Sequence, residues 1–326
     1  MSNFRSATLR VSDQQPTDSE VADEVLTSLA ETPPRLPSKY FYDERGSKLF
    51  DQICELPEYY LTRTELAIMQ ADARHMAQRI GPGATLVEFG SGSSLKTRLL
   101  LEALEDPAAC VLIDISAEHL FAVTEELARD FPHIEFIPVA GDFTQPLELP
   151  EPSRPARRRV VYFPGSTIGN FARDDAARLL DGIRQTAGAD GGALIGVDRV
   201  KDPAVLEAAY NDSAGVTAEF NRNVLAHLNR VLEGDFDPLA FEHRAPWVTE
   251  ASRIEMHLVS KTDQEVSLAG ERLGFARDQV IVTEFSHKYT LEAFSDLAAE
   301  SGLDVAQVWS DAAEYFSVMY LEPARG

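Results

Sequence analysis

Hydrophobic positions in the middle of the chain form short apolar runs separated by amphipathic segments. The runs "ATLVEF" (84–89) and "CVLIDI" (110–115) have the length of buried strands, and apolar residues at helical spacing follow each of them, at 96–105 and 117–131. Similar runs recur up to "GALIGVDRV" (192–200). Strands that alternate with helices predict an α/β fold with a mostly parallel, doubly wound sheet.

The pattern changes on both sides of this region. After Lys201, two helical segments are followed by two strand-like runs, and a final helix and strand pair then return to the central pattern. Before it, "SKLFDQICELPEYY" has apolar residues at helical spacing up to Pro57. The "TRTE" sequence (62–65) has the spacing of a capping box, which predicts that the next helix begins there.

These changes predict two domains, each built from separate parts of the chain. We expect residues 64–200 and 287–326 to form the α/β core. Residues 20–63 and 201–286 are expected to form a second, α+β domain. The first 19 residues are polar, which predicts a disordered tail.

Charge and composition narrow the possible partners. The chain has 326 residues and a formal net charge of -23, from 30 basic and 53 acidic residues. Such a surface repels phosphate backbones and anionic lipid, so neither nucleic acid nor a membrane is expected as a partner. The two cysteines form no C-x-x-C pair, no apolar signal sequence is evident, and the seven histidines have no metal-ligand spacing. We therefore expect a cytoplasmic protein without a metal.

Acidic residues at the ends of successive predicted strands indicate a nucleotide-like cofactor. Glu88 precedes the glycine turn at Gly90, Asp114 ends the next strand, and Asp142 with Phe143 follows the third. An acid in the second position can accept hydrogen bonds from ribose hydroxyls. An acid and a ring in the third position suit an adenine base.

Two cofactors fit this layout, a dinucleotide and S-adenosylmethionine. The dinucleotide fingerprint G-x-G-x-x-G is incomplete, because Leu95 occupies the third glycine position. Glu88 would repel a pyrophosphate but could help to hold a ligand that carries an ammonium and a sulfonium. The segment therefore favours S-adenosylmethionine over a nicotinamide cofactor.

Five long segments of the chain together resemble one enzyme family, the histidine N-alpha-methyltransferases of ergothioneine biosynthesis. The resemblance covers about residues 36–320 and is carried by "FYDERGSKLFDQICELPEYYLTRTE" (41–65), "LVEFGSGSSLKTRLLL" (86–101), "FPGSTIGNF" (163–171), "AYNDSAGVTAEFNRNVL" (209–225) and "RIEMHL" (253–258). It implies a class I, Rossmann-like methyltransferase core with a separate substrate domain. It also implies that three S-adenosylmethionine molecules in turn methylate the α-amino group of L-histidine to give hercynine.

The resemblance assigns roles to individual residues. Tyr42 and Tyr59 would act at the amine as orienting groups first and bases second, and Tyr59 and Tyr210 would bind the substrate carboxylate. The remaining implied contacts to the substrate come from Gly165, Asn170, Met256, Glu284 and Ser286, and those to the cofactor from Phe50, Gly90, Lys96, Asp114, Asp142 and Phe143.

The acceptor pocket also has a chemical argument. In "TEFSH", alternation along a strand places Glu284 and Ser286 on one face, and a carboxylate beside a hydroxyl can bind both polar edges of an imidazole. Met256 shares a face with two other apolar residues, which indicates core, and the resemblance implies that it is also a wall of the imidazole pocket. The alternative function is that of an N-methyltransferase for another amino acid, such as tryptophan. We expect the protein to be a monomer.

Overall fold

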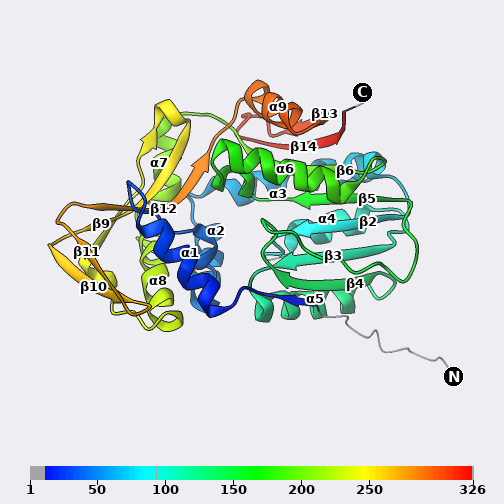
Figure 1. The fold of residues 1–326 in the computed structure, drawn as a ribbon. Helices are drawn as coiled ribbons and strands as arrows, with labels where there is room; N and C mark the ends of the chain where they lie inside the picture. The colour runs from blue at the N-terminus through cyan, green and yellow to red at the C-terminus, as the bar shows by residue number, and fades with distance from the viewer. Residues whose placement is uncertain (1–11, 93, 325–326) are drawn as a thin grey trace.

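The computed structural model describes residues 12–92 and 94–324 of the protein. A sheet of eight strands forms one side of the molecule, on the right in Figure 1. The order is β1-β4-β3-β2-β5-β6-β14-β13. Strands β1 to β6 pair in parallel, whereas β14 is antiparallel to both β6 and β13. The bounds are β1 Ser12–Gln14, β2 Ala84–Phe89, β3 Ala109–Asp114, β4 Glu135–Gly141, β5 Arg158–Phe163, β6 Gly192–Asp198, β13 Leu303–Ser310 and β14 Phe316–Pro323. The predicted fold class is confirmed.

Helices cover both faces of this sheet. On one face Leu86 and Leu112 pack with residues of α3 (Tyr60–Ile80), α4 (Leu95–Ala103) and α5 (Ala117–Asp130). On the other face Val87 and Val111 pack with residues of α6 (Arg173–Ala187) and α9 (Leu291–Glu300). Neighbouring residues of a strand thus enter opposite cores, which explains why these strands are continuous apolar runs.

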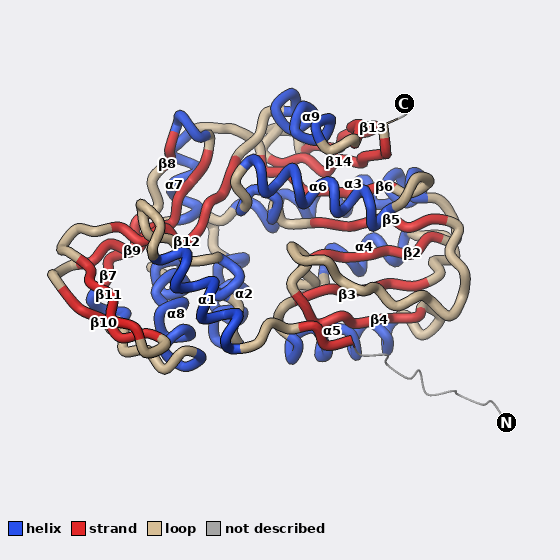
Figure 2. The backbone as a smooth tube through the Cα atoms, in the orientation of Figure 1, coloured by secondary structure: helices blue, strands red, loops and turns tan. Residues whose placement is uncertain are grey.

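The remaining elements lie beside the sheet and share a third hydrophobic core (Figure 2). All buried residues of this core fall within 21–61 and 206–281. This separation supports our proposal that 20–63 and 201–286 form a second domain. Its elements are α1 Asp18–Leu29, η1 Ser38–Phe41, α2 Glu44–Glu55, α7 Pro203–Tyr210, α8 Val216–Val231, η3 Pro238–Ala240, β7 Phe241–Arg244, β8 Trp247–Val248, η4 Thr249–Ala251, β9 Arg253–Ser260, β10 Gln264–Leu268, β11 Glu271–Phe275 and β12 Val280–His287.

Two sequence predictions about element boundaries are wrong. Residues 12–19 are not a disordered tail, because β1 pairs with β4 at the edge of the sheet and α1 begins at Asp18, whereas residues 1–11 lie outside the described part of the chain. The helix expected from Thr62 begins at Tyr60. Thr62 instead donates a hydrogen bond to the Cys54 sulfur, because the "TRTE" segment is already inside α3.

Composition-based expectations can be compared with the described part of the chain. Within it, no helix is both long and apolar enough to cross a membrane. Cys54 and Cys110 are both free thiols. No group of three or more His, Cys, Asp or Glu side chains among residues 12–92 and 94–324 is arranged to hold a metal ion.

Candidate active site

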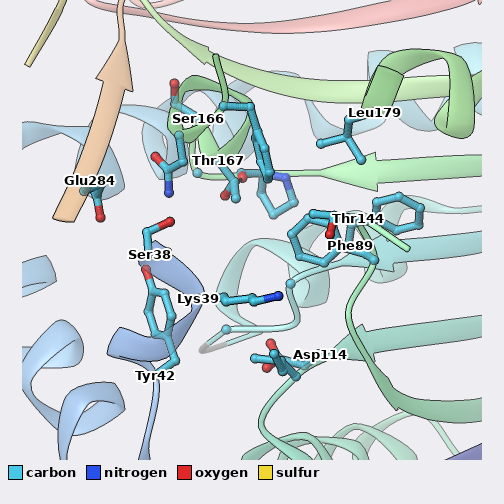
Figure 3. Close-up of a pocket in the computed structure, with 18 of the residues that line it drawn as sticks. Ser38, Lys39, Tyr42, Phe89, Asp114, Thr144, Ser166, Thr167, Leu179 and Glu284 are labelled. Carbon is cyan, nitrogen blue, oxygen red and sulfur yellow. Dashed lines mark hydrogen bonds between the residues drawn. The ribbon is translucent and has the colours of Figure 1, made fainter. Parts of the chain in front are cut away.

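One large cavity, of about 1940 Å³, opens at the carboxyl ends of the parallel strands and extends to the second domain. Figure 3 shows Asp114 and Phe89 on the sheet side, and Tyr42 and Glu284 opposite them. Each of the fourteen site residues expected from the sequence lines this one cavity: Tyr42, Phe50, Tyr59, Gly90, Lys96, Asp114, Asp142, Phe143, Gly165, Asn170, Tyr210, Met256, Glu284 and Ser286. The structure therefore brings together residues up to 244 positions apart.

The turn after β2 leaves open space beside a fixed carboxylate. Gly90 has a φ of +80°, and a Cβ added there would meet no atom within 4 Å. Asp114 at the end of β3 accepts hydrogen bonds from the Ser91 amide at 3.0 Å and from the Ser116 amide at 2.9 Å. These two bonds fix the orientation of the Asp114 side chain at the cavity wall. Burial raises the pKa of Asp114, although both amides oppose the shift.

Glu88 is a buried acid with one unpartnered oxygen in the same wall. Its Oε1 accepts a hydrogen bond from the Thr97 hydroxyl at 2.7 Å, whereas Oε2 has no partner among the described residues. Burial raises the pKa of Glu88 to about 8. An unpartnered buried acid is costly unless a ligand completes it. A cationic ligand would do so, which fits a cofactor with an ammonium group.

Asp142 and Phe143 lie after β4, as expected, and both have neighbours from distant segments. Asp142 accepts hydrogen bonds from the Thr144 amide and hydroxyl and forms an ion pair with Lys39 at 2.8 Å. Burial opposes ionisation, but the Lys39 ammonium and the Thr144 donors lower the pKa of Asp142 overall. Phe143 stacks on Phe89 with ring centroids 5.5 Å apart. The pair forms a flat apolar surface of the kind that a purine needs.

Four aromatic residues form a connected row along the second domain's side of the cavity. Ring centroids are 5.7 Å apart between Tyr42 and Phe50, 6.1 Å between Phe50 and Tyr59, and 6.1 Å between Tyr59 and Tyr210. Burial raises the pKa of both Tyr42 and Tyr59 well above 10. Both phenols therefore remain protonated at neutral pH and can act as hydrogen-bonding groups.

Glu284, Ser286 and Met256 form the polar end of the cavity. Glu284 on β12 lies directly opposite Met256 on β9, and Ser286 is one alternation further along β12. The Glu284 carboxylate accepts no hydrogen bond from residues 12–92 or 94–324, and burial raises its pKa to about 7. Ser286 Oγ and the Tyr210 hydroxyl lie 2.7 Å apart. The arrangement offers an acceptor and a hydroxyl pair side by side.

An ion pair that the sequence did not reveal joins three segments of the α/β core beside the cavity. Lys96 lies 2.5 Å from the fully buried carboxylate of Glu65, which also accepts a hydrogen bond from the Gly165 amide at 3.0 Å. The sequence predicted only a helix-capping role for Glu65, as part of the "TRTE" segment. Asn170 ends η2 (Thr167–Asn170), and its amide makes no hydrogen bond to the part of the chain that the structure describes. That amide is available to a ligand.

Two further residues beside the cavity were missed by sequence reasoning. Lys288 donates hydrogen bonds to Ser286 and Tyr210 and forms an ion pair with Asp198. The alternation that grouped Glu284 with Ser286 extends to Lys288 and could have found it. Asp198 carries the same signal as the cofactor acids, since it ends a buried strand.

A family model and several known proteins are similar to this chain over most of its length. A family model described as "Histidine-specific methyltransferase, SAM-dependent" matches residues 21–323. The chain is 42% identical to the histidine N-alpha-methyltransferase of Mycolicibacterium smegmatis and 41% identical to that of Mycobacterium tuberculosis, in each case over 90% of this chain and 92% of the relative. It is 33% identical to ergothioneine biosynthesis protein 1 of Neurospora crassa, over 87% of this chain and 32% of that longer protein.

Proposed function

Because the chain belongs to the family of histidine-specific, S-adenosylmethionine-dependent methyltransferases, we propose that it transfers three methyl groups to the α-amino nitrogen of L-histidine. The product would be Nα,Nα,Nα-trimethylhistidine, or hercynine. One observation carries the choice of acceptor: Glu284 and Ser286, which suit an imidazole, line the same cavity as the turn at Gly90.

The residues on the sheet side are proposed to hold the cofactor. Asp114 would accept from the ribose hydroxyls, while Asp142 and Phe143 would bind the adenine edge and face. The open space beside Gly90 would admit the methionine part of the cofactor. The ammonium group of that part would donate a hydrogen bond to the Glu88 oxygen that has no partner among the described residues. Phe50 and Lys96 would close the region between cofactor and substrate. S-adenosylmethionine supplies a methyl group on a sulfonium, so the acceptor needs a free lone pair.

The residues on the other side are proposed to hold histidine. Glu284 and Ser286 would bind the two imidazole nitrogens, and Met256 would pack against the ring. Tyr59, Tyr210 and Asn170 would bind the carboxylate. The Gly165 backbone would lie beside the amine. These contacts are supported by two groups that line the cavity and have no hydrogen-bond partner among the described residues, the Glu284 carboxylate and the Asn170 side-chain amide.

The chain's contribution to the reaction is proposed to be alignment and control of one proton. The α-amino group has a pKa of about 7.7–8.0 in a peptide and a higher one in a free amino acid, so the amine of histidine must lose a proton before it can attack. Tyr42 and Tyr59 would orient the amine and guide its proton toward water. Their strongly raised pKa values favour an orienting role over that of a base. Holding the nitrogen in line supplies much of the rate, and the aromatic row suits a quaternary ammonium product.

The alternative acceptor is another amino acid, such as tryptophan. An indole has one N–H and no ring lone pair, so it could donate to Glu284 but would offer no acceptor to the hydroxyl of Ser286. A buried hydroxyl proton without an acceptor costs on the order of 1–3 kcal/mol. The polar end of the cavity therefore favours histidine.

Mass spectrometry of the purified enzyme with S-adenosylmethionine and each of histidine, tryptophan, tyrosine and phenylalanine tests the proposal. Histidine that gains three methyl groups is the expected result. Methylation of a different amino acid alone would retain the cofactor but overturn the roles of Glu284 and Ser286. Absence of product with all four would overturn the proposed acceptor class.

We also propose a cellular setting for the reaction. The name of the Neurospora crassa relative supports a place in ergothioneine biosynthesis. Two free cysteines support a reducing, cytoplasmic location. The fourteen proposed site residues come together within one chain, so the site needs no residue from a partner subunit, and we propose a monomer. A molecular mass from light scattering that matches a dimer would contradict the proposed monomer.

A further inference from the structure

A buried cluster of charges lies directly behind the polar end of the cavity. Asp198, the last residue of β6, forms ion pairs with Lys288 at 2.7 Å and with Lys201 at 2.6 Å. The side chains of Asp198 and Lys288 are 0% exposed, and that of Lys201 is 5% exposed. A buried ammonium has a large desolvation cost, which only close and well-placed partners can offset.

The contacts of Lys288 use its full capacity as a donor. Its Nζ lies 2.7 Å from Asp198 Oδ2, 2.8 Å from Ser286 Oγ and 2.9 Å from the Tyr210 hydroxyl. An ammonium has three protons and no acceptor. Each proton is therefore matched to one oxygen, and both hydroxyl oxygens must accept from Lys288.

Counting protons shows what the hydroxyl pair can offer to a ligand. Ser286 and Tyr210 carry one hydroxyl proton each, and neither can point toward Lys288. Their oxygens lie 2.7 Å apart, so one proton is used in the bond between them. Both side chains line the cavity. One proton remains, and it is available only to a hydrogen-bond acceptor in the cavity.

We propose that Lys288 is a positioning residue that makes the pair of Ser286 and Tyr210 a dedicated single donor for an acceptor atom of the substrate. This inference rests on the proposed function. With Glu284 accepting the N–H of an imidazole, the single donor serves one of the two contacts proposed above for this pair, the unprotonated ring nitrogen at Ser286 or the carboxylate at Tyr210, and not both at once. The pair thereby selects ligands that present an N–H and a lone pair in the right places.

Lys201 provides a matched control within the same cluster. Its Nζ contacts Asp198 Oδ1, the Tyr60 hydroxyl and the Arg199 carbonyl, but neither Ser286 nor Tyr210. Replacement of either lysine by methionine removes one buried charge from Asp198 and leaves the other lysine beside it. Only the Lys288 change frees the two hydroxyls to turn away from the cavity.

Steady-state kinetics of Lys288→Met and Lys201→Met test the inference. We expect Lys288→Met to raise the KM for histidine about 10- to 100-fold, the loss of one or two hydrogen bonds in a buried site. Its kcat should change less than about threefold, and calorimetry should give an S-adenosylmethionine Kd within about twofold of wild type. Lys201→Met should leave the histidine KM within about threefold. Equal effects of the two variants on KM would overturn the inference.

A double-variant cycle separates positioning from a merely structural role. If Lys288 acts through the hydroxyl pair, then adding Lys288→Met to a protein that lacks both hydroxyls (Ser286→Ala with Tyr210→Phe) should raise KM by no more than about twofold. Multiplying effects would show that Lys288 acts independently of the hydroxyls, which overturns the inference.

A second substitution covers the case in which Lys288→Met does not fold. Lys288→Gln keeps two N–H donors but adds an acceptor oxygen toward which a hydroxyl proton can turn. It should also raise the histidine KM, and an unchanged KM in this variant would overturn the inference. Wild-type enzyme that fails to methylate histidine would instead overturn the proposed function, so the two failures are distinguishable.

Discussion

The buried side chain of Glu88 leads to a quantitative prediction about cofactor binding. With a pKa of about 8, Glu88 is about 90% protonated at pH 7 in the free enzyme. Ionising it at that pH costs about 1.4 kcal/mol. An ammonium about 4 Å away contributes on the order of 4 kcal/mol at an effective dielectric constant of 20, which exceeds the cost. Binding of S-adenosylmethionine should therefore expel the proton.

Calorimetry in two buffers measures this proton directly. We expect wild-type enzyme to release about 0.8 to 0.9 of a proton from Glu88 on binding at pH 7, and almost none at pH 9, where Glu88 is already largely ionised. The heat of binding in phosphate and in Tris differs in proportion to the protons released. The cofactor's own amine also titrates, but with a pKa of about 7.7–8.0 it is already mostly protonated at pH 7, so protonating it fully on binding takes up no more than about 0.2 of a proton.

Glu88→Gln is the matched variant, because it keeps the shape and the hydrogen bond from Thr97 but has no proton to lose. The difference in proton release between the two proteins at pH 7 isolates the contribution of Glu88. Equal proton release by wild type and Glu88→Gln would refute the reasoning. It would show that the cofactor's cation does not reach this carboxylate.

Three further variants test other parts of the site and the core. Asp114→Ala should weaken S-adenosylmethionine binding at least about tenfold by calorimetry, because two ribose hydrogen bonds are lost; unchanged affinity would refute the ribose role. Glu284→Ala should raise the histidine KM about 10- to 100-fold with little change in cofactor affinity, and equal losses in both would contradict its place in the acceptor pocket. Gly196→Ala should destabilise the fold by about 1–3 kcal/mol in a denaturant titration, because the added Cβ would lie 2.4 Å from a Glu65 oxygen. Gly182→Ala is the control, because Gly182 lies in a helix and a Cβ added there would meet no atom within 4 Å. This variant should be neutral or stabilised by up to about 1 kcal/mol. Equal effects of the two alanine substitutions would be inconsistent with steric crowding at Glu65.

The parts of the fold that could be predicted from the sequence are those with a local signal. The strands of the sheet are buried on both faces, so they stand out as apolar runs with acids at their ends, as at Glu88 and Asp114. The return of the chain to the sheet at β14 was visible for the same reason, because residues 316–321 are buried, whereas β13 is mostly exposed. Specific roles for Met256 and Glu284 needed the family resemblance, because a polar residue on a strand normally indicates only an exposed face.

The features that were missed depend on contacts between distant segments. The ion pair of Lys39 with Asp142 joins residues 103 positions apart, and nothing in the sequence around Lys39 indicates it. Glu65 matched a local capping pattern, but its partners Lys96 and Gly165 come from other elements. The predicted start of α3 was wrong because Glu65 does not cap this helix. It instead binds Lys96 and the Gly165 amide from other parts of the fold.

The position of the transferred methyl groups tests the central claim most directly. The enzyme would be incubated with histidine and S-adenosylmethionine labelled with carbon-13 in its methyl group, and the product examined by NMR. The account predicts three equivalent labelled methyl groups on the α-nitrogen and none on the ring, because Glu284 holds the imidazole at the polar end of the cavity. A labelled methyl group on an imidazole nitrogen would contradict the proposed orientation of histidine in the cavity.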